Sequence, residues 1–269
     1  MKLKNKFLPA MLMFGVVAFS SCDKSEQETL EPEFEQGTLS RIMADSSEVT
    51  SYDFAGKQVS QVNHYNTTTS KVESFEKFIY DAKGKLIKAT THAGANHAVL
   101  SEQAYIYNDK GMLTTTTTSY FNGGKTEYSS YSKYEYTTDK KLKKKTVYEG
   151  TESADAAGIA KSFTTYEALP NGNYTQEKQH VVDDKGKAKL FSTTTYSYDA
   201  SHNPFFEFAE PGTTSSPNNL LASSTLVHGS NKTYKYTYSY KYDDNGYPVS
   251  QTVTKPDGTR ETFTYVYSN

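Results

Sequence analysis

The segment YDAKGKL at residues 80–86 decides the fold class of this chain. A tyrosine ends one stretch, Asp81 and Gly84 supply a turn, and Leu86 opens the next stretch. Aspartate bonds to its own backbone in turns and glycine tolerates a positive φ, so the segment predicts a hairpin between two β-strands.

The same segment recurs along the chain with substitutions. It reads YNDKGML at residues 107–113, YTTDKKL at 136–142 and YDDNGYP at 242–248. The turn tyrosines, spaced 28, 27, 29, 30, 32 and 44 residues apart, are Tyr52, Tyr80, Tyr107, Tyr136, Tyr166, Tyr198 and Tyr242. A nearly fixed period indicates a repeat architecture.

Most periods contain a second turn near their middle, at residues 66–70, 93–96, 122–124, 183–186 and 256–258. Each period therefore holds two strands of about 8–10 residues, and the chain holds about 14–16. We predict an all-β antiparallel meander, closed or strongly curved into a barrel-like sheet, because closure removes exposed strand edges.

The predicted strands have one aromatic and one polar face. In KTYKYTYSYKY at residues 232–242, tyrosines alternate with lysine, threonine and serine, which is the period of a strand. Buried phenol groups need hydrogen-bond partners. We expect a partly hydrated interior, or hydroxyls at the solvent edge, in place of a dry aliphatic core. No helical periodicity follows residue 21.

The N-terminus has the layout of a secretory signal, with three lysines at positions 2, 4 and 6, an apolar run at 7–19, and two serines before Cys22. The run of about 13 residues is shorter than the roughly 20 that span a bilayer. Serine pairs before a lone cysteine resemble the lipobox of bacterial lipoproteins, although Phe19 replaces the usual aliphatic residue. This resemblance implies cleavage before Cys22 and palmitate-type acylation of Cys22. The alternative is an ordinary signal peptide with an incidental cysteine.

Three regions follow from these patterns. Residues 1–21 are a lipoprotein signal peptide, residues 22–47 are the lipidated cysteine and a flexible acidic tether, and residues 48–269 are a single β-hairpin-repeat domain. The tether has too little apolar surface to fold. Removing the three lysines of the signal changes the formal charge from −2 to −5, and this mild acidity argues against nucleic-acid binding.

Two family resemblances rest on these motifs. The Tyr-Asp turn at residues 80–86 is similar to the YD repeats of Rhs-type proteins. Lipobox, acidic tether and Tyr-Asp hairpins together resemble an uncharacterised family of Gram-negative lipoproteins with a porin-like β fold and no assigned function. The second resemblance implies an exported protein on the outer membrane or cell surface.

The sequence offers no convincing chemistry. His92 and His97 flank a turn without a third metal ligand nearby, so we interpret them as exposed hairpin residues. The stretches 183–186 and 243–246 lack the spaced oxygens of a calcium loop and are interpreted as turns. We predict no catalytic residue, no cofactor and no metal site.

Five lysines surround Leu142 at residues 140–145. We favour a solvated face or a guard against edge pairing over contact with anionic lipid or polysaccharide.

Two insertions interrupt the repeat, at residues 150–160 and 210–219. Long loops on a β scaffold often carry binding sites. The candidate ligand surface lies beside the second insertion and on the tyrosine-rich strand, and consists of Phe205, Phe206, Phe208, Tyr234, Tyr236 and Tyr238.

The resulting expectation is a non-catalytic, lipid-anchored envelope protein that binds a glycan or an envelope protein, or acts as a scaffold. Abundant tyrosine would suit stacking on sugars. The alternatives are a polysaccharide-acting enzyme, which requires two carboxylates facing a cleft, and a membrane-spanning barrel, which requires a continuous apolar outer band. A mean hydropathy of −0.72 disfavours the barrel in a membrane.

Overall fold

The Tyr-Asp segment forms the predicted turn in the computed structural model, which describes residues 37–150, 158 and 160–268. The Asp81 amide donates to the Lys85 carbonyl at 2.8 Å, and the Asp81 carboxylate accepts from the amides of Lys83 and Lys85. Gly84, at φ 79°, takes the left-handed conformation. Its amide donates to the Asp81 carbonyl at 3.0 Å, so four hydrogen bonds close the turn and fix the register of the strands on either side.

The backbone bond between the first and fifth residues of this turn recurs in six other turns. Their end residues are Asn108 and Met112, Thr137 and Lys141, Leu169 and Asn173, Asp183 and Lys187, Asp243 and Tyr247, and Lys255 and Thr259. Glycine occupies the left-handed position in five of these six, and Lys140, at φ 61°, occupies it in the turn at 137–141. The two stretches that echo calcium loops are turns of this kind.

Sixteen strands and one short 3₁₀ helix make up the described residues. The elements are β1 (Thr38–Ala44), β2 (Ser47–Ala55), β3 (Gln58–Asn66), β4 (Lys71–Tyr80), β5 (Leu86–Ala93), β6 (Val99–Tyr107), β7 (Leu113–Asn122), β8 (Lys125–Tyr136), β9 (Leu142–Glu149), β10 (Ala160–Ala168), β11 (Tyr174–Val182), β12 (Ala188–His202), η1 (Phe206–Phe208), β13 (Asn218–Val227), β14 (Lys232–Tyr242), β15 (Pro248–Thr254) and β16 (Arg260–Ser268).

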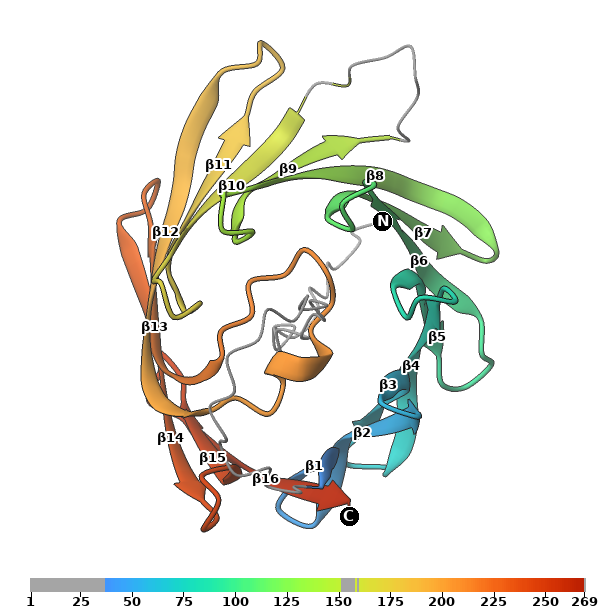
Figure 1. The fold of residues 1–269 in the computed structure, drawn as a ribbon, viewed down its shortest axis with the longest axis vertical. Helices are drawn as coiled ribbons and strands as arrows, with labels where there is room; N and C mark the ends of the chain where they lie inside the picture. The colour runs from blue at the N-terminus through green and yellow to red at the C-terminus, as the bar shows by residue number, and fades with distance from the viewer. Residues whose placement is uncertain (1–36, 151–157, 159, 269) are drawn as a thin grey trace, which may run out of the picture.

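The strands form a closed antiparallel barrel in which each pairs with its neighbours in sequence (Figure 1). The first and last strands complete the ring, with Ile42 of β1 opposite Tyr265 of β16. This confirms the predicted all-β meander and selects the closed form. Strand β1 lies within residues 22–47, the range expected to be tether, so the barrel begins about ten residues earlier than the repeat indicated.

Closure overturns the guard interpretation of the lysines at residues 140–145. Strand β9 pairs with β8 on one side and with β10 on the other, so it is not an edge strand. Lys141 donates instead to the carbonyl oxygens of Leu169 and Pro170. Lys145 shares a face with the buried Tyr134 opposite it, with its ammonium nitrogen 5.6 Å from the ring centroid. Lys144, its neighbour in β9, points to the outer face.

The barrel has two ends, because successive turns of a meander alternate. We call one of them the Tyr-Asp end, because it contains the turns at residues 81–85, 108–112, 137–141, 169–173 and 243–247. The other is the opposite end. The first buried residues after the Tyr-Asp turns form much of the main core cluster, namely Val59, Leu86, Leu113, Leu142 and Tyr174. The core therefore lies inside the barrel toward the Tyr-Asp end.

The connection between β12 and β13, residues 203–217, folds into the barrel (Figure 1). We call this segment the plug. It contains η1, and Phe208 contacts both buried clusters of the core. The insertion predicted as a surface loop is thus largely an internal one.

The predicted aromatic and polar faces of β14 are confirmed. Tyr238 and Tyr240 lie opposite Val253 and Gln251, whose side chains are buried, whereas Lys235 and Lys241 lie on the other face. Several strand-ending tyrosines donate to main-chain carbonyls of a neighbouring strand, in the pairs Tyr80–Val59, Tyr107–Leu86, Tyr198–Tyr174, Tyr240–Leu220 and Tyr267–Pro248. These five phenol groups therefore find partners in the backbone, whereas the buried Tyr265 hydroxyl has no hydrogen-bond partner among the described residues.

Candidate functional site

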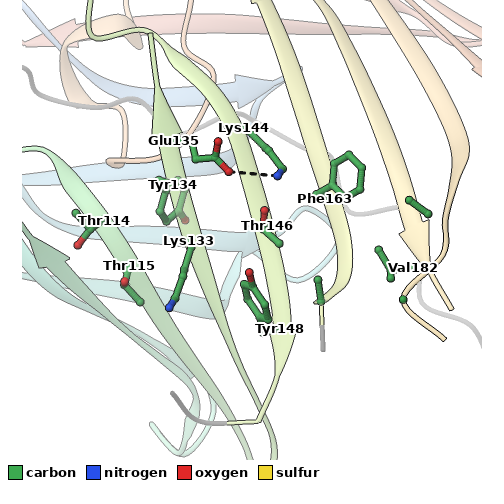
Figure 2. A pocket seen from close by; sticks show the side chains of 13 residues that line it. Thr114, Thr115, Lys133, Tyr134, Glu135, Lys144, Thr146, Tyr148, Phe163 and Val182 are labelled. Atoms are coloured by element: carbon green, nitrogen blue, oxygen red, sulfur yellow. Dashed lines mark ion pairs between the residues drawn. The ribbon is translucent and has the colours of Figure 1, made fainter. Parts of the chain in front are cut away.

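A hollow of about 700 Å³ lies on the outer face of the barrel between β7 and β12 (Figure 2). Lys133 and Glu135 flank the inward Tyr134 in β8 and so point outward, and Lys144 lies opposite Glu135. The side chains that matter for its chemistry are Thr115, Lys133, Lys144, Thr146, Tyr148 and Phe163.

Two ammonium groups of the hollow lie over aromatic rings. The Lys144 nitrogen is 5.1 Å from the Phe163 ring centroid and 3.2 Å from the Glu135 carboxylate. The Lys133 nitrogen is 5.7 Å from the Tyr131 centroid. Such cation–π contacts hold a lysine side chain along the protein surface.

Each of these rings is stacked on a partner across the strand pair. Phe163 lies 4.4 Å from His180 with an interplanar angle of 11°, and Tyr131 lies 4.7 Å from Tyr148 at 4°. Both contacts join directly opposed residues, which are the strongest side-chain neighbours in a sheet. Two cross-strand ring stacks therefore support the wall of the hollow.

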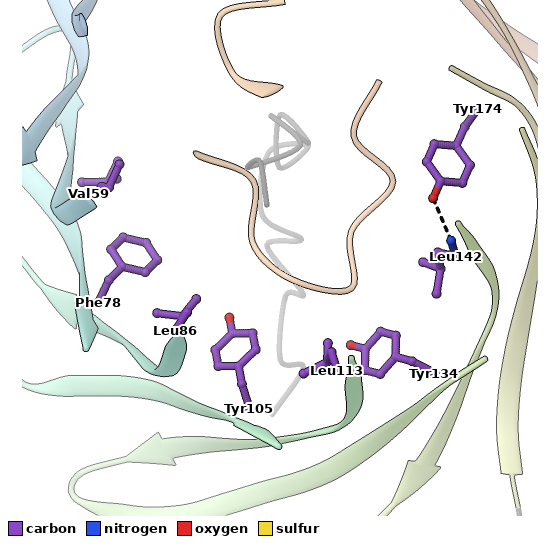
Figure 3. Close-up of a cluster of buried hydrophobic side chains, with 9 residues drawn as sticks. Val59, Phe78, Leu86, Tyr105, Leu113, Tyr134, Leu142 and Tyr174 are labelled. Carbon is purple, nitrogen blue, oxygen red and sulfur yellow. Dashed lines mark hydrogen bonds between the residues drawn. The ribbon is translucent and has the colours of Figure 1, made fainter. Parts of the chain in front are cut away.

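The interior of the barrel is crossed by the plug. Phe208 contacts Tyr52 and Phe54 of β2, with ring centroids 6.1 and 5.7 Å away, and Phe205 contacts Tyr265 of β16 edge-on. Figure 3 shows core side chains such as Phe78, Tyr105 and Tyr134 pointing inward around it. The plug thereby braces distant parts of the wall.

Glu210 of the plug is buried and accepts a hydrogen bond of 2.6 Å from the Tyr105 hydroxyl. Burial raises the pKa of Glu210 and nearby Glu76 adds to this, whereas the Tyr105 hydrogen bond and Lys145 oppose it. The carboxyl group thus binds the plug to β6 at the cost of its own desolvation.

A second interior carboxyl group, Glu177 of β11, accepts a hydrogen bond of 3.1 Å from the plug residue Thr214. Burial raises the pKa of Glu177, and hydrogen bonds from Tyr196 and Thr214 oppose the rise. Both interior glutamates therefore connect the plug to the wall, which is a structural use of these groups.

The residues predicted as a ligand surface divide into two groups. Phe205, Phe208, Tyr236 and Tyr238 come together, packed against the second core cluster beside Phe263 and its neighbours. Phe206 and Tyr234 are 38% and 44% exposed. Cys22, the predicted lipidation site, and most of the insertion at 150–160 lie outside the described residues.

Three exposed tyrosines point into the barrel toward the opposite end. Tyr120 follows Thr116 and Thr118 on one face of β7, and the Thr116 hydroxyl is 3.0 Å from that of the core residue Tyr134. Tyr120 is 48% exposed and Tyr128, directly opposite it on β8, is 42% exposed, with 6.1 Å between ring centroids. Tyr234 on β14 is the third. Solvent therefore reaches aromatic rings on the inner wall.

Sequence reasoning missed Tyr120 and Tyr128. The signal was present, because Tyr120 has the same strand parity as Thr116 and Thr118. Alternation along the strand shows that these residues share a face, but it does not show whether that face points into the barrel or out of it.

His92 and His97 both pack on Phe75 of β4. His92 stacks on the ring at 4.8 Å and His97 meets it edge-on at 5.2 Å. Within residues 37–150, 158 and 160–268, no three His, Cys, Asp or Glu side chains are grouped so as to hold a metal ion. The same residues include no helix of the length and apolarity needed to cross a membrane.

Comparison with solved structures finds matches at low sequence identity, with TM-scores below 0.5. A porin-like protein from Bacteroides vulgatus has a TM-score of 0.42 and 14% identity, covering 86% of this chain and 99% of its own. A porin-like protein from Bacteroides uniformis has a TM-score of 0.42 and 16% identity, covering 87% and 98%. The TcdB2-TccC3-Cdc42 structure has a TM-score of 0.36 and 14% identity, with 83% of this chain but 12% of the other covered. No family model and no curated protein matches this chain.

Proposed function

We propose that this protein is an exported envelope barrel, held on the membrane by lipid on Cys22, that binds a glycan without catalysis. The ligand enters the barrel at the opposite end and stacks on the exposed inner tyrosines. One observation carries the binding role: Tyr120, Tyr128 and Tyr234 point inward and yet remain between 42% and 48% exposed.

Tyrosine is suited to this role because its ring offers an apolar face and its hydroxyl a hydrogen bond. Sugar rings have an apolar face of matching shape and hydroxyls around it. Because the main core cluster lies toward the Tyr-Asp end, we place the approach of the ligand at the opposite end. The rings of the tyrosines there remain partly exposed, whereas Tyr236 and Tyr238 pack against the second core cluster.

The charged side chains on the outer face of the barrel favour attachment to the membrane by lipid over insertion of the strands into the bilayer. Ion pairs such as Lys178–Glu167 at 3.0 Å and Lys144–Glu135 at 3.2 Å lie on strands of this face. Charged side chains on the lipid face of a membrane barrel are destabilising. Two or more acyl chains on Cys22 would hold the protein stably on a membrane.

The test is calorimetric titration of the Cys22→Ser chain with neutral oligosaccharides of increasing length. We expect binding that falls about tenfold or more in Tyr120→Ala and Tyr128→Ala, since one stacked ring contributes about 1–3 kcal/mol in related aromatic contacts. The matched control is Tyr65→Ala, whose hydroxyl lies 3.1 Å from that of Ser51 on the outer face. Equal affinities in all three variants would rule out the inner site.

A further inference from the structure

We propose that the inner tyrosine site selects sugars with free hydroxyl groups, because the two protein hydroxyls beside Tyr120 can only accept hydrogen bonds from a ligand. These hydroxyls belong to Ser101 of β6 and Thr118 of β7. The selectivity rests on the binding role proposed above and adds the chemical class of the ligand, a sugar whose hydroxyl groups are unmodified where it meets the wall.

Both hydroxyls lie next to the Tyr120 ring on the inner wall. Ser101 is directly opposite Tyr120 across the β6–β7 pair, and Thr118 precedes Tyr120 by two residues on the same face of β7. Directly opposed residues have Cβ atoms about 4.5–5.5 Å apart, and residues two apart on a strand are separated by about 6–7 Å. Ser101 and Thr118 are both partly exposed. A sugar ring stacked on Tyr120 therefore brings its own hydroxyls within reach of both.

A chain of three hydrogen bonds sets the direction of the Thr118 hydroxyl. Thr118 donates to Oε1 of Gln103 at 3.2 Å, and Nε2 of Gln103 donates to the Tyr105 hydroxyl at 2.7 Å. The Tyr105 phenol has one proton, which it donates to Glu210 of the plug at 2.6 Å, so its oxygen accepts from the amide nitrogen of Gln103. The amide oxygen is then left to accept from Thr118. The Thr118 proton is therefore committed to Gln103.

The Ser101 hydroxyl is committed in a similar way. It donates to Oγ1 of Thr91 at 3.0 Å, across the β5–β6 pair in which these two residues are directly opposed. A serine or threonine hydroxyl has one proton and two lone pairs. Because both protons are used within the wall, Ser101 and Thr118 offer only lone pairs to a ligand inside the barrel.

Two fixed acceptors select a ligand that carries donors. A free sugar hydroxyl can donate to either oxygen, whereas a methyl ether at the same position has no proton and would place oxygen against oxygen. A site built to hydrogen-bond a substrate hydroxyl rejects the analogue that lacks it, because the polar groups of the site are then left unpaired. Since Ser101 and Thr118 are partly exposed, water moderates this loss, and we expect a preference of about tenfold.

The test compares cellotriose with its fully O-methylated form by calorimetric titration of the Cys22→Ser chain. We expect this parent chain to bind cellotriose about tenfold or more tightly than the methylated probe. The preference should largely disappear in Ser101→Ala/Thr118→Val, which removes both acceptors and keeps the Tyr120 ring. The matched control is Thr117→Val/Ser119→Ala, which removes one threonine and one serine hydroxyl from the outer face of the same strand.

Gln103→Leu tests the direction of the hydrogen-bonded chain while leaving both hydroxyls of the site in place. Without the amide oxygen, the Thr118 proton is free to donate to a ligand. The preference for cellotriose should therefore fall although Ser101 and Thr118 are unchanged. An unchanged preference in this variant, with the native circular dichroism spectrum, would show that the chain does not set the selectivity.

The ratio of the two affinities separates selectivity from a general loss of binding. An unchanged ratio in Ser101→Ala/Thr118→Val, with the native circular dichroism spectrum, would overturn the proposal, and so would an equal fall of the ratio in the control pair. If Tyr120→Ala still weakens cellotriose binding in either case, the inner site stands and only its selectivity fails. If the parent chain binds neither probe, the proposed binding role fails together with the selectivity.

Discussion

The hydroxyl of Tyr107, at the end of β6, donates a hydrogen bond of 2.7 Å to the carbonyl oxygen of Leu86, the first residue of β5. The same contact joins Tyr80 to Val59 in the preceding unit. In these two units the tyrosine of the Tyr-Asp turn thus joins its own hairpin to the one before it, and Tyr198 does the same through the Tyr174 carbonyl. This explains physically why the motif begins with tyrosine, since phenylalanine would fill the space without making the bond.

Replacing Tyr107 by phenylalanine should therefore destabilise the barrel. The Leu86 carbonyl would lose its partner inside the core, which typically costs about 1 kcal/mol. Urea unfolding followed by circular dichroism would measure the change. Tyr234→Phe, at an exposed ring, should change stability by much less; an equal effect of both substitutions would show that the carbonyl contact is not the cause.

Lys140→Gly should stabilise the protein. Lys140 has φ 61° at the position that glycine occupies in the other turns of this type. Relief of left-handed strain, about 1–2 kcal/mol, exceeds the entropic cost of glycine, about 0.5–1 kcal/mol. Gly186→Ala is the reverse experiment, because its φ is 78° and nothing lies within 4 Å of the added Cβ. It should lower the melting temperature while Lys140→Gly raises it.

Gly212→Ala should loosen the plug. Its φ is 85°, and an added Cβ would lie 2.5 Å from Cε1 of Tyr134 and 2.8 Å from a methyl group of Leu113. Overpacking of this kind costs about 1–3 kcal/mol. Hydrogen exchange by mass spectrometry should show faster exchange in residues 203–217, with β14 and β15 much less affected. Uniform acceleration throughout the barrel would mean that the plug is not a separable element.

The plug also gives the protein a specific pH dependence. Burial raises the pKa of Glu210 in the folded state above its unfolded value, so the folded protein binds the proton more tightly. Proton binding at Glu210 therefore stabilises the folded state. This contribution to the free energy of unfolding is fully present below the unfolded pKa, about 4.3, and is lost as the pH rises through the folded pKa.

Glu210→Gln should accordingly be more stable than the parent chain at pH 8 and similar to it near pH 4. Urea titrations at both values, with the exposed Glu127→Gln as control, would measure this difference. A stability difference independent of pH would show that the pKa of Glu210 is not raised in the folded state.

The turns and strand faces could be predicted because their signals are local. Asp81 and Gly84 fix a turn within five residues, and the alternation in β14 shows its two faces directly. The start of the barrel could not be located in this way. Strand β1 lacks the Tyr-Asp motif, and its place depends on pairing with β16, where Ser40 bonds to Val266 across 226 residues of sequence.

The plug was unpredictable for a similar reason. Residues 210–219 have the Pro, Ser, Thr and Asn content of a surface loop. Its inward fold depends on Glu210 meeting Tyr105 and on Gly212 fitting against Tyr134, which are contacts of tertiary structure. The outer hollow likewise needs six neighbouring strands in register, from β7 to β12, although its lysines were evident in the sequence.

Lipid anchoring through Cys22 is tested most directly by fractionation of the Cys22→Ser chain expressed with its own signal. We propose that lipid on Cys22 is the attachment to the membrane and that the barrel, with ion pairs on its outer face, lies in water. Lipid anchoring predicts that the variant leaves the membrane for the aqueous fraction and retains the circular dichroism spectrum of a β protein. Retention of the folded variant in carbonate-washed membranes would contradict it.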